Sequence, residues 1–74
     1  MKTEIEKAFN TIKQAMIDDN PSEQGSLAHS WHSNIAMAVY DECPTSINHE
    51  DSLRIGNEAA SRFMKLCFGV ETKA

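Results

Sequence analysis

The amino-terminal part of the chain has apolar residues at helical spacing. At 100° per residue they fall within about 120° of arc, which is typical of a helix with one buried face. They are Ile5, Ala8, Phe9, Ile12, Ala15 and Met16. Thr3 followed by Glu6 has the spacing of a capping box, and Pro21 disfavours helical backbone in the residue before it. The pattern therefore predicts a helix over about residues 3–18.

The next segment repeats the signals of a helix start. Pro21 and Glu23 follow Asn20 at the positions typical of a first helical turn, whereas Gly25 weakens that turn by about 1 kcal/mol relative to alanine. A second helix is therefore predicted over about residues 22–42, with its firm part beginning after Gly25. One arc of roughly 120° on this helix is expected to face the core. It holds Leu27, Trp31, Ile35, Ala38 and Val39.

The opposite side of the second helix is not simply polar. Between about 180° and 280° on the same helical wheel it lacks charge and carries apolar and aromatic side chains. Its members are His29, Ser33, Ala36, Met37 and Tyr40, and the first charged residue of the helix is Asp41. Because a surface helix normally buries one stripe, something should cover this second face. The first helix, a second copy of the chain or another protein could do so.

A third helix is predicted over about residues 49–68. Asn48, with Asp51 three residues later, resembles an N-cap. Gly69 stops the helix, and Val70 is placed to fold back on its last turn. The apolar residues sweep about 220°, more than a surface helix needs. They are Leu53, Ile55, Ala59, Ala60, Phe63, Met64, Leu66, Cys67 and Phe68.

Two features of this third helix bear on its packing. Gly56 and Ala60 lie one turn apart and form a small-residue notch, which we expect another helix of the same chain to fill. Glu58 and Arg62 have the spacing of an exposed ion pair. The predicted fold is an all-α, three-helix domain over residues 1–74, either monomeric or dimeric, with residues 70–74 as a frayed tail. The core is expected to include Trp31, Ile35, Phe63 and Leu66.

Length and charge narrow the classes of function. The chain has 74 residues, near the lower limit for a domain that folds unaided. It carries 7 Lys and Arg against 11 Asp and Glu, a net charge of −4 that repels phosphate backbones. Its first ten residues contain no apolar run of the kind found in a signal peptide or a membrane span. We therefore expect a cytosolic protein with no direct nucleic-acid partner and no membrane partner.

The candidates for chemistry are few. Cys43 and Cys67 lie far apart without C-x-x-C spacing, so reduced structural thiols are expected. Asp41 and Glu42 are adjacent on a helix and diverge by 100°, so they cannot act as a facing acid and base. The sequence predicts no enzyme and assigns no catalytic residue, cofactor or metal.

Two alternatives remain from the residues alone. His29 and His32 are three apart on a helix and could hold a metal if further ligands came from His49, Asp51 or Cys43, although that set is incomplete. Otherwise His32 is expected beside Trp31 or at the end of a neighbouring helix. A helix-turn-helix DNA reader is the second alternative. The possible reading cations, Arg54, Arg62 and Lys65, are mixed with acidic residues, which disfavours it.

Two sequence blocks carry a resemblance. WHSNIAMAVYDE at 31–42 and GNEAASRFMKLCFGVET at 56–72 together resemble a group of very small phage and prophage proteins. In that group a Trp-His pair opens an Ile-Ala-Met-Ala helix, and an Ala-Ala-Ser-Arg-Phe-Met-Lys helix follows. The resemblance extends from Ser26 onward and leaves the first helix outside. It implies a bacterial-virus gene product that works in host cytoplasm, and it transfers no activity.

The predicted function is a phage-encoded modulator or inhibitor that binds a host cytosolic protein, such as a defence protein, without catalysis. The expected partner-binding residues are His29, Ser33, Met37, Tyr40 and Asp41. Tyr40 is the expected hot spot, because an aromatic ring with a polar tip provides a large contact area at low entropic cost. The alternatives are a homodimeric structural module whose second apolar face is buried against itself, or a small metal- or DNA-binding protein.

Overall fold

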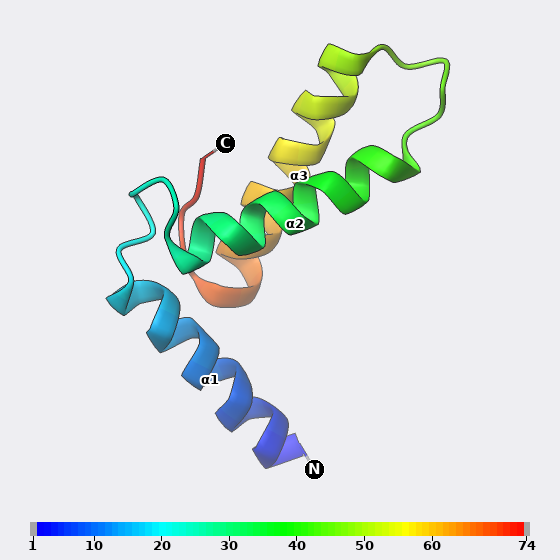
Figure 1. Ribbon diagram of the computed structural model, residues 1–74. Coiled ribbons are helices and arrows are strands. Elements are labelled where there is room, and N and C mark those ends of the chain that lie inside the picture. The colour runs from blue at the N-terminus through cyan, green and yellow to red at the C-terminus, as the bar shows by residue number, and fades with distance from the viewer. Residues whose placement is uncertain (1, 74) are drawn as a thin grey trace.

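A computed structural model describes residues 2–73, and within this range the chain forms three α-helices and no strand (Figure 1). The helices are α1 (Lys2–Asp18), α2 (Leu27–Glu42) and α3 (His49–Phe68). The prediction of an all-α, three-helix fold is confirmed. Because α1 already includes Lys2, Thr3 is a helical residue and the predicted capping box does not begin the helix.

The firm part of α2 begins after Gly25, as predicted, but the weaker turn predicted from about residue 22 is not helical. The helix begins at Leu27 and not near residue 22, because Asn20 and Gly25 have φ angles of 55° and 94°, which a right-handed helix cannot contain. Ser26 is the N-cap, and its Oγ accepts a hydrogen bond from the backbone N–H of His29 at 3.2 Å. The Asp19 carboxylate also accepts from the N–H of Leu27. Pro21 therefore lies in the connection between α1 and α2 and not in the first turn of a helix.

Both ends of α3 agree with the prediction. Asn48 is the N-cap, and its side-chain oxygen accepts from the N–H of Asp51 at 2.8 Å. Gly69 ends the helix with a φ of 67°, the left-handed conformation common at this position. The N–H of Val70 then bonds back to the carbonyl of Met64 at 3.4 Å, so the chain folds over the last turn as expected.

Helices α2 and α3 pack closely through one row of each helix, with small residues where the backbones cross and larger ones farther along α3. The buried positions are Ala28, His32 and Ala36 on α2, and Ser52, Gly56, Ala60, Met64 and Phe68 on α3. Rows of this spacing interdigitate when two helices cross. A Cβ atom on Gly56 would lie 2.5 Å from the carbonyl oxygen of Ala36, so the two backbones touch at this point. The notch predicted at Gly56 and Ala60 is therefore filled by α2 of the same chain.

The close crossing overturns most of the predicted core. Ile35 is half-buried against the core, but Trp31, Phe63 and Leu66 are exposed to 38%, 43% and 85%. A contact in which backbones touch leaves no space for large side chains, so these residues lie on the flanks of the α2–α3 pair. The predicted core stripe of α2 is wrong for the same reason, since the Ala28 row, and not the Trp31 row, faces α3.

Helix α1 meets the pair through its middle and its carboxyl-terminal end, from Phe9 to Met16, and its first turns extend away from the pair (Figure 1). Met16 is completely buried, and the ring of Phe9 stacks on Phe68 with centroids 4.6 Å apart. Ile5, on the same stripe, is 67% exposed. The predicted one-sided helix forms, but only half of its apolar side is covered within the chain.

The segment after α3 lies beside the first turns of α2 (Figure 1). Val70 and Thr72 are buried. The hydroxyl of Ser61 donates to the carbonyl of Thr72 at 3.0 Å, and Thr72 Oγ1 lies 2.6 Å from His32 Nδ1. The expectation of a frayed tail over 70–74 is therefore wrong for this part, because two polar contacts hold the segment to both helices. Ala74 lies outside the described residues.

Candidate functional site

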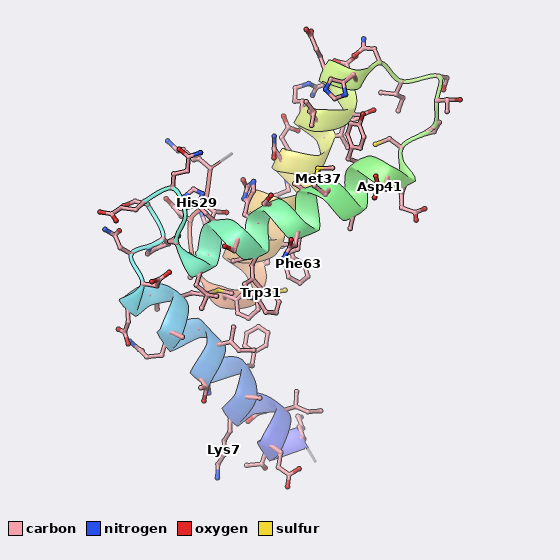
Figure 2. All side chains as sticks on the ribbon, viewed as in Figure 1. Lys7, His29, Trp31, Met37, Asp41 and Phe63 are labelled. Carbon is pink, nitrogen blue, oxygen red and sulfur yellow. The ribbon has the colours of Figure 1, made fainter. Side chains whose placement is uncertain are left out.

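Three of the five predicted partner-binding residues line one groove. His29, Ser33 and Met37 follow one side of α2 at successive turns and form one wall. Figure 2 shows His29 and Met37 on the side of α2 opposite to Trp31. Residues from α3, the carboxyl-terminal segment and the connection between α1 and α2 form the other walls, and the groove has a volume of about 680 Å³. The residues of these walls include Leu53, Asn57 and Lys73.

The other two predicted residues lie farther along α2. The hydroxyl of Tyr40 is 2.7 Å from His49 Nδ1, and the two rings meet edge to face with centroids 5.5 Å apart. This contact joins the end of α2 to the start of α3. Asp41 is exposed near the end of α2 (Figure 2). Neither residue lines the groove. The hypothesis that the first helix covers Tyr40 is wrong, because α1 packs against Phe68 on the other flank.

His32 is the most buried polar group at the groove, with 2% of its surface exposed. Its Nδ1 contacts Thr72, so it holds the carboxyl-terminal segment and does not pack as a helix cap. Burial lowers the pKa of His32 from its usual 6.5, because the charged imidazolium loses its hydration. Asn57 opposes this by a smaller amount, and the nearby His29 adds to the lowering of the pKa. His32 is therefore neutral at physiological pH.

Two imidazole nitrogens at the groove lack partners. Nε2 of His29 and Nε2 of His32 are both buried and make no hydrogen bond of normal geometry within residues 2–73, although the Asn57 side chain lies near His32. The two rings lie 6.4 Å apart between centroids, and both side chains line the groove. A buried polar atom without a hydrogen bond is costly and is uncommon in folded proteins. A polar group entering the groove would satisfy one or both nitrogens.

The residues considered for metal binding or thiol chemistry do not come together. Among the residues that the structure describes, no three His, Cys, Asp or Glu side chains are close enough to hold one ion. His49, a possible third ligand, instead contacts Tyr40. The Cys43 thiol donates to the carbonyl of Val39 at 3.4 Å, and Cys67 is half-buried on α3.

A second exposed feature lies on the opposite flank. Phe68 is at its centre, with the rings of Trp31 and Phe63 at 6.0 Å and 6.2 Å and Phe9 stacked on it. The exposed aliphatic side chains of Ile5 on α1 and Leu66 on α3 extend this aromatic cluster. We call this feature the aromatic surface, and it consists of Ile5, Phe9, Trp31, Phe63 and Leu66.

Sequence reasoning assigned Trp31, Phe63 and Leu66 to the core and so missed the aromatic surface. The signal that would have found it is the row of small residues at every fourth position of α3. Such a row marks the face where another helix approaches closely, and larger neighbours then lie beside the contact.

The charges of α3 are paired differently from the prediction. Arg54 lies 3.6 Å from both Asp51 and Glu58, so the expected Glu58–Arg62 pair does not form. Lys65 lies 3.4 Å from Glu71. These exposed pairs contribute little to stability. They do neutralise two of the cations that a DNA-reading helix would present.

No protein-family model matches the chain, and no solved structure shows significant similarity to it. None of the three helices is both long enough and apolar enough to cross a membrane, considering the residues that the structure describes. The function of the chain is therefore inferred from its groove and its surfaces.

Proposed function

We propose that the protein acts by binding another protein through the groove between α2 and α3, without catalysis. The observation that carries this proposal is the pair of buried, unpartnered Nε2 atoms of His29 and His32 in a groove whose rim exposes Met37. Such a site offers hydrogen bonds at its base and an apolar contact at its edge. A protein partner can supply a polar group for the base of the groove and an apolar group for its edge from one side chain or from neighbouring ones.

The dimensions and chemistry of the groove suit an inserted side chain. A volume of about 680 Å³ lies within the range of small-ligand sites, so the groove has room for a side chain of a partner. Met37 and Leu53 are adaptable apolar contacts, since methionine in particular can fit differently shaped partners. None of the described residues that line the groove is Asp, Glu or Cys, whereas Glu71 lines an adjacent cavity that shares His29 and Lys73 with the groove.

The proposed partner is a host cytosolic protein, and the proposed role is that of a phage-encoded modulator or inhibitor, for example of a defence protein. The support is the likeness of the blocks at 31–42 and 56–72 to small phage proteins. His32, Ser33 and Met37 fall in the first block, and Asn57 falls in the second, so both blocks contribute walls to one groove.

Capture from a bacterial lysate tests this proposal. The full chain carrying an affinity tag is compared with Met37→Arg, which blocks the groove, and with Asn34→Arg, an equal charge change at an exposed position of the same helix. We expect the wild type and Asn34→Arg to retain one host protein and Met37→Arg to lose it at least about tenfold. Circular dichroism shows that the three chains are equally folded. A host protein retained equally by all three, or none retained by any, contradicts the proposal.

Tyr40→Ala extends the test to the far end of α2. If the partner reaches beyond the groove, this variant should weaken capture by about 1–3 kcal/mol while the fold is kept, as expected of an aromatic contact residue. A lower melting temperature with unchanged binding of the folded protein would limit Tyr40 to its contact with His49.

A further inference from the structure

We propose that two copies of this chain associate through the aromatic surface, with the amino-terminal half of each α1 lying over Phe63 and Leu66 of the other copy. This surface is on the flank of the α2–α3 pair opposite to the groove. The inference therefore goes beyond the proposed function and does not rest on it.

The first argument is the accessible area of the chain. The folded chain exposes 5454 Å², whereas a compact protein of 8.3 kDa exposes roughly 4600 Å². The excess is about 900 Å². A stable interface of standard size hides about 800 Å² on each partner. The chain thus exposes the additional area that one such interface would cover.

The extended shape of the chain shows where the additional accessible area lies. Its radius of gyration is 13.5 Å, compared with about 11 Å for a compact domain of this length. The molecule measures 42 × 30 × 15 Å, and α1 extends away from the α2–α3 pair (Figure 1). Ile5 on the extended half of α1 and Leu66 on α3 are the two most exposed large apolar residues of the described chain. The uncovered apolar area is therefore divided between the first turns of α1, called the arm, and the flank of the α2–α3 pair at Phe63 and Leu66, called the body.

This division favours a second copy over an unrelated protein. Each chain has an apolar stripe around Ile5 on α1 that packs on nothing within residues 2–73. It also has an apolar surface around Phe63 and Leu66 on α3 that nothing within this range covers. A twofold arrangement places the stripe of each copy on the surface of the other, so both are buried in one closed, self-complementary interface. No other molecule is needed to complete either region.

Carboxylates beside the first region can pair with a guanidinium beside the second. Glu4 and Glu6 flank Ile5 on α1, and Arg62 lies one turn before Leu66 on α3. None of these three side chains takes part in an ion pair within residues 2–73. When α1 of one copy lies over Leu66 of the other, carboxylates meet a guanidinium at the rim, which favours association over like-charge repulsion.

The molar mass of the purified full chain in solution tests the proposal. Sedimentation equilibrium over a dilution series should give twice the chain mass of 8.3 kDa at high concentration. Leu66→Glu changes an already exposed side chain, so the fold should be kept while the dimer dissociation constant rises at least about 30-fold. Met37→Glu, the matched change on the groove side, should leave the dimer intact. A wild type that stays monomeric, or a Leu66→Glu chain that dimerises normally, overturns the proposal.

A mixing experiment tests the reciprocal contact itself. Ile5→Lys and Leu66→Glu should each be monomeric alone, because each places a charge in both copies of the contact. Mixed in equal amounts, they should form a heterodimer with one unaltered contact and one contact in which the introduced lysine faces the introduced glutamate. Absence of the heterodimer overturns the arm-on-body arrangement. Capture of a host protein is measured separately, so failure of either proposal is recognised by its own readout.

Discussion

The α2–α3 pair and α1 are held in the fold by different means. The pair is joined by small residues at the crossing, where the backbones of Gly56 and Ala36 touch, and by larger buried residues farther along α3. Helix α1 has larger apolar residues but is joined mainly by Met16 and by the stacking of Phe9 on Phe68. Close packing therefore depends on the shape of the contacting faces and not on the size of the apolar side chains. The helix with the clearer amphipathic pattern is the one that is only partly covered.

Replacement of Phe68 should have the largest effect, because its ring joins α1 to the pair. It is 4% exposed and contacts Phe9, Trp31 and Phe63. Phe68→Ala should lower the free energy of unfolding by about 3–5 kcal/mol, which is most of the stability of a domain of this size. The half-exposed Phe63 is the matched control, and Phe63→Ala should cost less than half as much. Urea denaturation of both variants in a Leu66→Glu background, where the second copy is absent, measures the difference, and equal losses would contradict the central place of Phe68.

A methyl group at the helix crossing should have the next largest effect. Gly56→Ala would place a Cβ atom 2.5 Å from the Ala36 carbonyl oxygen, so the two backbones must move apart. We expect a net loss of roughly 2–3 kcal/mol, although alanine is the better helix former by about 1 kcal/mol. Glu58→Ala, an exposed change two residues away on α3, should alter the stability by about 0.5 kcal/mol or less. A Gly56→Ala chain as stable as the wild type would show that the pair is less closely packed than described.

Loss of the Phe9 ring should separate the two regions without unfolding the pair. Because Phe9 is half-buried, Phe9→Ala should cost about 1–2 kcal/mol, less than a fully buried phenylalanine. Hydrogen exchange should show faster exchange of the α1 amides and unchanged exchange of the α3 amides, since local openings follow local contacts. The comparison is made in a Leu66→Glu background, where the second copy is absent. Uniformly faster exchange in all three helices would mean that α1 and the pair unfold as one unit.

The smallest expected effect is on the pH dependence of the folding stability, through His32, which joins the α2–α3 pair to the carboxyl-terminal segment. The pKa of His32 is lower in the folded chain than the usual 6.5, so the unfolded chain binds a proton first as the pH falls. The stability contributed by neutral His32 is therefore fully present above pH 6.5 and is lost as the pH falls below that value toward the lowered pKa. His32→Gln should remove this part of the pH dependence. Parallel curves of stability against pH for the two chains would contradict the burial of His32.

The local features of the fold could be predicted from the sequence alone. Apolar spacing identified three helices, and the signals at Asn48 and Gly69 placed both ends of α3 correctly, because helix caps involve only neighbouring residues. The start of α2 was less predictable. Pro21 fits a helix start, but the left-handed conformations of Asn20 and Gly25 break the segment before Ser26 caps it.

The candidate site was predictable only along one helix. The shared side of His29, Ser33 and Met37 follows from helical spacing, but the opposite wall of the groove comes from α3 and from the carboxyl-terminal segment. The burial of His32 depends on Thr72, forty positions later in the chain. No local pattern contains such a contact, because it forms only after the segment folds back across the pair.

The sequence by itself determined the helices, most of their ends and the separation of the second helix into two unlike sides. Only the tertiary structure decided which row of each helix faces its neighbour. Large and small residues both recur at every fourth position, so spacing alone cannot distinguish a core row from a flanking row. The backbone contact between Gly56 and Ala36 excludes large side chains from the crossing. Trp31, Phe63 and Leu66 are exposed for that reason, and the aromatic surface results from it.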